Sequence, residues 1–114
     1  MNESSVLVIE SDPIVRESLS GWLSSTGFEV TSAEDGAKII KVFAKSDFNI
    51  VIMDVRLHSE TQLATLREMK AIRPWIKTII ITSHPQEETV LEAKKIGVVD
   101  YIVKPVDMDD LQKI

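Results

Sequence analysis

The chain has 114 residues, of which 44% are hydrophobic, and 18 acidic against 13 basic side chains give it a net charge of −5. This length and composition predict a single globular domain over residues 1–114. The lack of cysteine excludes disulfide frameworks and cysteine-based sites, no apolar run approaches the roughly 20 residues that span a bilayer, and the acidic charge argues against direct binding to nucleic acid.

Short runs of apolar, mostly β-branched residues recur along the chain and predict five strands. The runs cover residues 6–9, 28–31, 49–53, 78–82 and 98–103. Most of them are apolar almost throughout, which is typical of parallel strands buried on both faces. The second run alternates between apolar and polar residues, which favours a strand at the edge of the sheet.

Segments with apolar residues at helical spacing lie between these runs and predict helices over residues 13–25, 35–44, 62–72 and 86–96. Asp12 is placed to cap the first helix, and Pro13 occupies its first position. Gly27 and Gly97 follow the first and fourth helices, as expected at helix C-termini. A fifth helix is expected to begin near Asp107.

The regular alternation of strands and helices predicts an α/β fold, because right-handed crossovers place helices on both faces of a parallel sheet. We expect a flavodoxin-like three-layer sandwich with a five-stranded parallel sheet of order 2-1-3-4-5 and five helices. Ligands of such open sheets bind beyond the carboxyl ends of the strands. The polar residues at those ends are therefore the candidate site.

Polar residues follow four of the predicted strands, at the edge where their carboxyl ends would meet. They are Glu10, Ser11 and Asp12 after the first strand, Asp54 at the third, Thr82 at the fourth and Lys104 after the fifth. Carboxylates can hold Mg²⁺ through oxygen, and one of them can attack phosphorus. A hydroxyl and an ammonium group can stabilise phosphoryl oxygens. The set therefore suits phosphoryl transfer.

Four motifs in this order resemble those of response-regulator receiver domains of bacterial two-component signalling. They are Val-Leu-Val-Ile-Glu-Ser-Asp-Pro (6–13), Ile-Val-Ile-Met-Asp-Val-Arg-Leu (50–57), Ile-Ile-Ile-Thr-Ser-His (79–84) and Asp-Tyr-Ile-Val-Lys-Pro (100–105). The resemblance covers essentially the whole chain. It implies a signalling module that catalyses only its own Mg²⁺-dependent phosphorylation and dephosphorylation, and not an enzyme with other substrates.

The resemblance also implies a role for individual residues. Asp54 matches the phosphoacceptor, which takes a phosphoryl group from a histidine kinase, and Thr82 and Lys104 match the residues that stabilise it. Thr82 and Tyr101 match the switch pair. Phosphorylation would then change the face formed by the fourth helix, the fifth strand and the fifth helix, roughly residues 86–114.

The implied metal site consists of Glu10, Asp54 and the main-chain carbonyl of Arg56, with Mg²⁺ as the cofactor. Ser11 stands where the family usually has a second acidic ligand. The site would therefore carry one negative charge fewer, and we expect weaker Mg²⁺ binding than is normal for the family. Asp12 is the nearest replacement ligand, although we expect it to cap the first helix instead.

Two further departures affect the segment after Asp54. His58 replaces a Pro, and Gln62 replaces a Gly at the family's next turn position, which predicts a less constrained or differently turned loop. These departures leave open an alternative, a phosphorylation-independent pseudo-receiver that acts as a protein–protein interaction module. A nucleotide-binding enzyme is disfavoured because no glycine lies in the turn after the first strand.

The resemblance predicts a cytoplasmic protein whose partner is a histidine kinase or phosphotransfer protein, with no membrane contact. A homodimer through the face at residues 86–114 is a further expectation. The predicted last helix stops after barely two turns at Ile114. We therefore expect one receiver domain cut from a longer chain, with an output module after residue 114.

Overall fold

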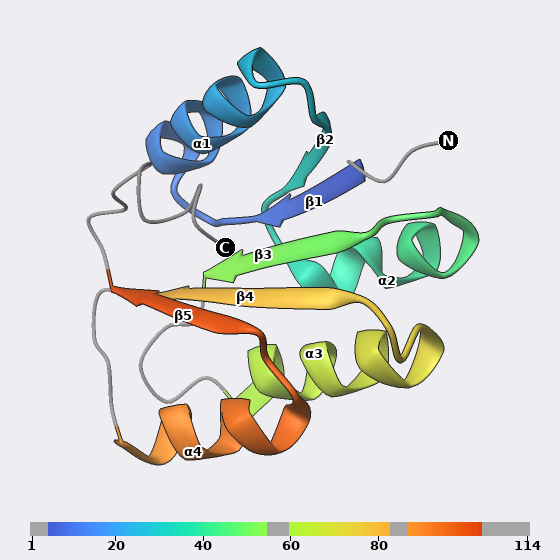
Figure 1. The fold of residues 1–114 in the computed structure, drawn as a ribbon, viewed down its shortest axis with the longest axis vertical. Helices are drawn as coiled ribbons and strands as arrows, with labels where there is room; N and C mark the ends of the chain where they lie inside the picture. The colour runs from blue at the N-terminus through green and yellow to red at the C-terminus, as the bar shows by residue number, and fades with distance from the viewer. Residues whose placement is uncertain (1–4, 55–59, 83–86, 104–114) are drawn as a thin grey trace.

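The computed structural model describes residues 5–54, 60–82 and 87–103, and this part of the chain contains one parallel sheet (Figure 1). Its strands pair in the order β2-β1-β3-β4-β5, which confirms the topology predicted from the sequence. The strands are β1 (Ser5–Ile9), β2 (Glu29–Ala33), β3 (Ile50–Asp54), β4 (Lys77–Thr82) and β5 (Asp100–Val103).

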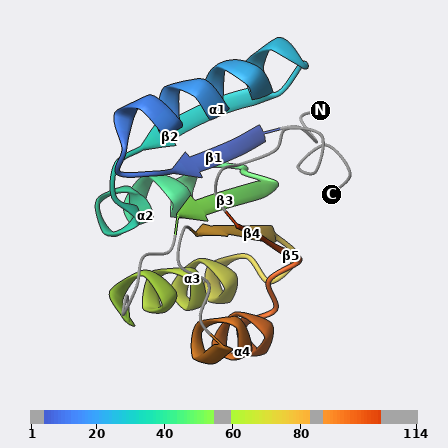
Figure 2. The ribbon, with the colours of Figure 1, turned by 90° about the vertical axis from the view of Figure 1, so that its left-hand side faces the viewer.

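Among the described residues, four helices flank this sheet and complete a three-layer arrangement (Figure 2). On one face lies α1 (Pro13–Ser25), and on the other lie α2 (Gly36–Lys45), α3 (Glu60–Ile72) and α4 (Glu87–Ile96). The flavodoxin-like α/β sandwich is thus confirmed. The predicted fifth helix, near Asp107, falls outside the described residues.

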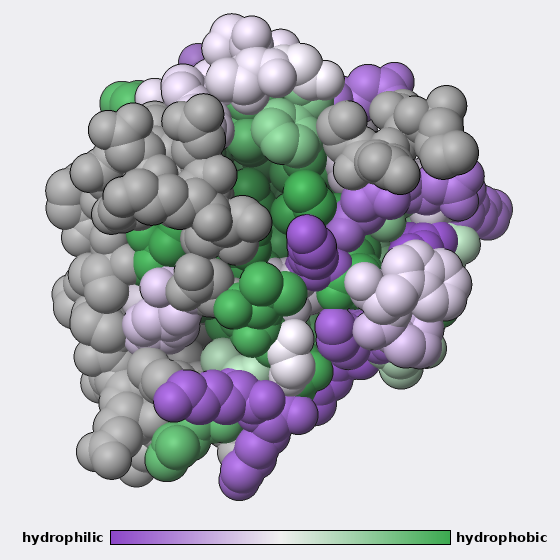
Figure 3. Space-filling view, in the orientation of Figure 1, coloured by the Kyte–Doolittle hydropathy of each residue, from purple (hydrophilic) through white to green (hydrophobic). Residues whose placement is uncertain are grey.

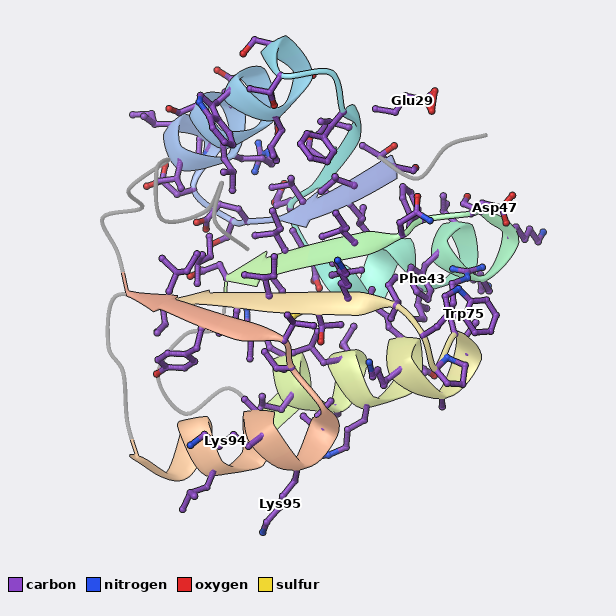
Figure 4. All side chains as sticks on the ribbon, in the orientation of Figure 1. Glu29, Phe43, Asp47, Trp75, Lys94 and Lys95 are labelled. Carbon is purple, nitrogen blue, oxygen red and sulfur yellow. The ribbon has the colours of Figure 1, made fainter. Side chains whose placement is uncertain are left out.

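The larger hydrophobic cluster lies between the sheet and the helices α2, α3 and α4. Leu7 of β1 and Met53 of β3 belong to it, together with Phe43 of α2 and Leu66 of α3. The ring of Phe43 stacks on that of Phe48 with 6.1 Å between their centroids. Figure 4 shows Phe43 at the end of the molecule opposite the carboxyl edge of the sheet. Burial of each large side chain stabilises the fold by about 1.5–3 kcal/mol.

The second cluster lies between the sheet and α1. It contains Val8 of β1, Ile52 of β3 and Ile81 of β4, against which Leu19 and Leu23 of α1 pack. Successive residues along these strands therefore enter opposite clusters, as the period of two requires. The central strands are buried on both faces, which explains why their sequences are apolar throughout.

The outside of these layers carries polar and charged side chains together with some exposed large apolar ones, such as Ile14 and Trp75. Figure 3 shows apolar side chains in the middle of the viewed face, with hydrophilic side chains along its lower and right-hand margins. Lys94 and Lys95 are exposed in the last turn of α4, where cations complement the helix dipole (Figure 4). No helix in the described part of the chain is both long and apolar enough to cross a bilayer.

Candidate functional site

The carboxyl ends of β1, β3 and β4 bring three of the predicted site residues to one edge of the sheet. Asp54 is the last residue of β3 and pairs with Ile81 of β4. Thr82, the next residue, ends β4. Glu10 follows β1 directly, and the last residue of β1 pairs with the residue before Asp54. The register therefore places Glu10, Asp54 and Thr82 at neighbouring positions on three adjacent strands.

These three polar side chains are almost completely buried. Their exposed fractions are 1% for Glu10, 4% for Asp54 and 2% for Thr82. A buried carboxylate costs free energy unless hydrogen bonds or a counter-charge compensate for its lost hydration. Two buried carboxylates on adjacent strands also repel each other, which makes this edge a favourable place for a cation.

Side-chain alternation assigns these residues to the two faces of the sheet. Glu10 lies two positions beyond Val8, and Asp54 lies two positions beyond Ile52. Both Val8 and Ile52 pack towards α1. Thr82 lies two positions beyond Ile80, which belongs to the cluster under α2, α3 and α4. Tyr101 pairs with Ile80 across the strands and packs against that same cluster. The two carboxylates therefore share one face of the sheet, and Thr82 and Tyr101 share the other.

The turn from β1 into α1 is held by hydrogen bonds. The Asp12 amide donates to Oε2 of Glu10 at 3.2 Å, and Oδ1 of Asp12 accepts from the Ile14 amide at 2.9 Å. Asp12 is therefore the N-cap of α1, which is one of the two roles that its sequence position allows. The Arg16 guanidinium donates to the main-chain carbonyls of Glu10, at 2.8 Å, and Ser11, at 3.5 Å.

Gln62 makes a contact that the sequence analysis did not anticipate. It lies in the first turn of α3, and its side-chain Nε2 donates to the main-chain carbonyl of Asp54 at 2.7 Å. The Gln62 amide therefore ties the start of α3 to the end of β3, whereas the loop that the sequence predicts to be less constrained or differently turned lies outside the described residues. His58, the other departure in this segment, lies outside the described residues.

The donor set at this edge suits a hard divalent cation. Mg²⁺ binds through one or two carboxylates and keeps several of its waters, and Glu10 and Asp54 supply two buried carboxylates. Within residues 5–54, 60–82 and 87–103, no group of three or more His, Cys, Asp or Glu side chains could hold a metal ion. The predicted carbonyl ligand Arg56 and the predicted phosphoryl partner Lys104 lie outside the described residues.

Comparison with known proteins gives one consistent match. The family model for the response regulator receiver domain matches residues 6–114. The transcriptional regulatory protein ZraR of Escherichia coli strain K12 is 36% identical over 111 residues, which is 94% of this chain and 24% of ZraR. The chain thus spans about a quarter of the length of the curated relatives that it matches.

Solved structures show the same fold. A CheY-like receiver domain protein from Methanospirillum hungatei superimposes with a TM-score of 0.89 at 24% identity, covering 96% of this chain and 88% of that one. The response regulator TrrA from Thermotoga maritima, solved in complex with Mg²⁺ and BeF, gives a TM-score of 0.83 at 26% identity. That match covers 99% of this chain and 95% of TrrA.

Proposed function

The chain belongs to the response regulator receiver family, and on that premise we propose that it works by accepting a phosphoryl group on Asp54. It is a receiver domain of two-component signal transduction, a family of regulators and not of metabolic enzymes. The observation that carries the proposal is the burial of Asp54 at the carboxyl end of β3, beside the equally buried Glu10.

Asp54 is the nucleophile in this proposal. One of its carboxylate oxygens attacks the phosphorus of a phosphohistidine on a histidine kinase or phosphotransfer protein, so that a carboxyl O–P bond forms as the P–N bond breaks. The departing imidazole keeps the electron pair of the broken bond and takes up a proton. Hydrolysis of the aspartyl phosphate ends the signal. Water attacks the phosphorus, Asp54 leaves as a carboxylate, and inorganic phosphate is released. Both steps are self-catalysed by the domain.

Thr82 and Lys104 stabilise the phosphoryl oxygens that this transfer creates. Thr82 lies at the end of β4, one position beyond the partner of Asp54, and in this proposal its hydroxyl turns over the carboxyl edge of the sheet to donate to a phosphoryl oxygen. Lys104 directly follows β5 and supplies a positive charge. Neutralisation and hydrogen bonding at these oxygens lower the energy of the charged transition state.

Glu10, Asp54 and the main-chain carbonyl of Arg56 would hold Mg²⁺, which when bound neutralises the charge between the carboxylates and the incoming phosphoryl oxygens. Ser11 contributes a neutral hydroxyl in place of a second acidic ligand, and Asp12 is engaged as the cap of α1. The site therefore binds Mg²⁺ more weakly than a receiver with two acidic residues after its first strand.

Thr82 and Tyr101 form the switch in this account. Both lie on the face of the sheet that packs against α2, α3 and α4, so a shift of Thr82 towards the phosphoryl group opens space for the Tyr101 ring. The affected surface comprises α4, β5 and the expected fifth helix. That surface passes the signal on to an output module or a partner protein, or forms a homodimer.

We further propose that the chain works in the cytoplasm as one receiver domain of a longer regulator. Its relatives are about four times as long, which leaves room for output modules of the kind that such regulators carry. The phosphorylation-independent pseudo-receiver finds no support in the comparisons, which match the receiver domain family and regulators such as ZraR.

The test is incubation of the chain with acetyl phosphate and Mg²⁺, followed by intact mass spectrometry. We expect the mass of one phosphoryl group to be added to the wild type, and none to Asp54→Asn or to wild type treated with a chelator. An unmodified wild-type chain, or an Asp54→Asn chain that is modified to the same extent, would refute the proposal.

A further inference from the structure

A side chain of α3 holds the main chain of the proposed phosphoacceptor. Nε2 of Gln62 donates to the carbonyl oxygen of Asp54 at 2.7 Å, and the bond is partly buried. The two residues are eight positions apart, on different elements. Unlike the main-chain hydrogen bonds of a sheet or a helix, this one has a side-chain donor. A single substitution at Gln62 can therefore remove it and leave the main chain chemically unchanged.

The position of this carbonyl makes the bond relevant to chemistry at Asp54. The carbonyl carbon and the side chain of Asp54 share one Cα atom, so a bond that fixes the carbonyl also fixes the direction in which the carboxylate leaves the backbone. A buried main-chain carbonyl at a strand end needs a hydrogen-bond donor, and Gln62 is such a donor. Misplacement of a reacting group by about 1 Å can cost a hundredfold in rate.

We propose that Gln62 is a positioning residue for phosphoryl transfer, which it promotes by holding the Asp54 peptide through its side-chain amide. This inference rests on the proposed function of Asp54. Because the amide holds the main chain of Asp54, we expect Gln62 to affect the rate of the transfer and not the binding of the phosphoryl donor.

The matched control lies on the same helix. Nζ of Lys70, towards the other end of α3, donates to the main-chain carbonyl of Ile76 at 2.8 Å, also in a partly buried setting. Gln62→Met and Lys70→Met each remove one side-chain donor from a main-chain carbonyl while keeping an unbranched side chain that favours helix. A purely structural role for Gln62 predicts that the two substitutions affect phosphorylation alike.

The experiment measures initial rates of phosphorylation by acetyl phosphate at saturating Mg²⁺, with each variant first shown to be folded by circular dichroism. We expect Gln62→Met to lower the maximal rate by about two- to tenfold, the range that corresponds to one hydrogen bond, with no change in the acetyl phosphate concentration that gives half the maximal rate. Gln62→Glu, which has the same shape without the donor, should lose at least as much. Lys70→Met should react at the wild-type rate.

Each possible result either supports or overturns the positioning role of Gln62. A wild-type rate in Gln62→Met, or an equal loss in Gln62→Met and Lys70→Met, would overturn the positioning role while leaving phosphorylation of Asp54 intact. A slower Gln62→Met whose defect lies entirely in the half-saturating concentration would overturn it as well. A wild-type chain that takes no phosphoryl group refutes the proposed function itself, which separates that failure from the failure of this inference.

Discussion

Ser11 determines how much negative charge the proposed metal site can offer. It follows Glu10 directly at the end of β1, and Arg16 holds the main-chain carbonyls of both residues. The backbone of the turn is thus fixed by contacts that do not involve the Ser11 side chain. A carboxylate introduced at this position would therefore join Glu10 and Asp54 without a need for the turn to rearrange.

We predict that Ser11→Asp raises the affinity for Mg²⁺ on the order of tenfold, because an added carboxylate supplies both an oxygen ligand and a negative charge. Isothermal titration calorimetry with MgCl₂ measures the change. Ser24→Asp adds the same charge about 20 Å away along α1 and should leave the affinity unchanged. Equal affinities in wild type and Ser11→Asp would show that Ser11 does not face the cation.

The polar residues that meet at the strand ends could be predicted from the sequence, whereas the side-chain hydrogen bonds between elements could not. Glu10, Asp54 and Thr82 each end an apolar run, so strand order alone brings them to one edge. The contacts of Arg16 and Gln62 depend on how far α1 and α3 lie from the sheet, which no periodicity encodes. The signal for Gln62 was only its departure from glycine.

At the scale of elements, the sequence predicted the type and order of every described helix and strand. The bounds of α1 agree completely because Asp12 caps its start and Gly27 follows its end with a φ of 101°. The largest difference is β2, predicted over 28–31 and observed at Glu29–Ala33. Its polar, half-exposed residues carry little hydrophobic signal, and its extent is set by backbone pairing with β1 alone.

Substitution of two glycines, one inside α1 and one just after it, should have opposite effects on the stability of the fold. Gly21 lies inside the helix with open space where a Cβ would be, whereas Gly27 has positive φ. Gly21→Ala should raise the free energy of unfolding by about 0.5–1 kcal/mol because alanine restricts the unfolded chain and favours helix. Gly27→Ala should lower it by about 1 kcal/mol because the left-handed conformation strains a residue with a Cβ.

Urea denaturation followed by circular dichroism checks both substitutions in one experiment. The two midpoints should move in opposite directions from the wild type, with the slope of the transition unchanged. A lower midpoint for Gly21→Ala would mean that the space beside α1 is filled in solution. An unchanged midpoint for Gly27→Ala would contradict the left-handed end of the helix.

For the molecule as a whole, two buried carboxylates concentrate negative charge at one edge of the sheet. Part of the charge of −5 is concentrated in Glu10 and Asp54, which are buried on adjacent strands, while Lys94 and Lys95 lie on the exposed surface of α4. Removing one of the two buried charges relieves both their repulsion and a desolvation cost. The fold should therefore be more stable without the carboxylate that we propose as its functional centre.

We predict that Asp54→Asn raises the free energy of unfolding by about 1 kcal/mol in the presence of a chelator, as is common when a functional site is neutralised. Mg²⁺ should reverse the order, because a ligand at a hundred times its dissociation constant stabilises the wild type by about 2.7 kcal/mol. Thermal unfolding of both proteins with and without Mg²⁺ measures these differences. A wild type that is indifferent to Mg²⁺ at high concentration would contradict the metal site.

Chemical labelling can test whether the phosphoryl group resides on the carboxylate of Asp54. Borohydride reduces an aspartyl phosphate to homoserine, so treatment of the phosphorylated chain followed by peptide mapping identifies the acceptor. We predict homoserine in place of Asp54 and at no other aspartate, Asp12 included. Homoserine at Asp12, or unaltered aspartate throughout a chain that carries a phosphoryl group, would contradict the account.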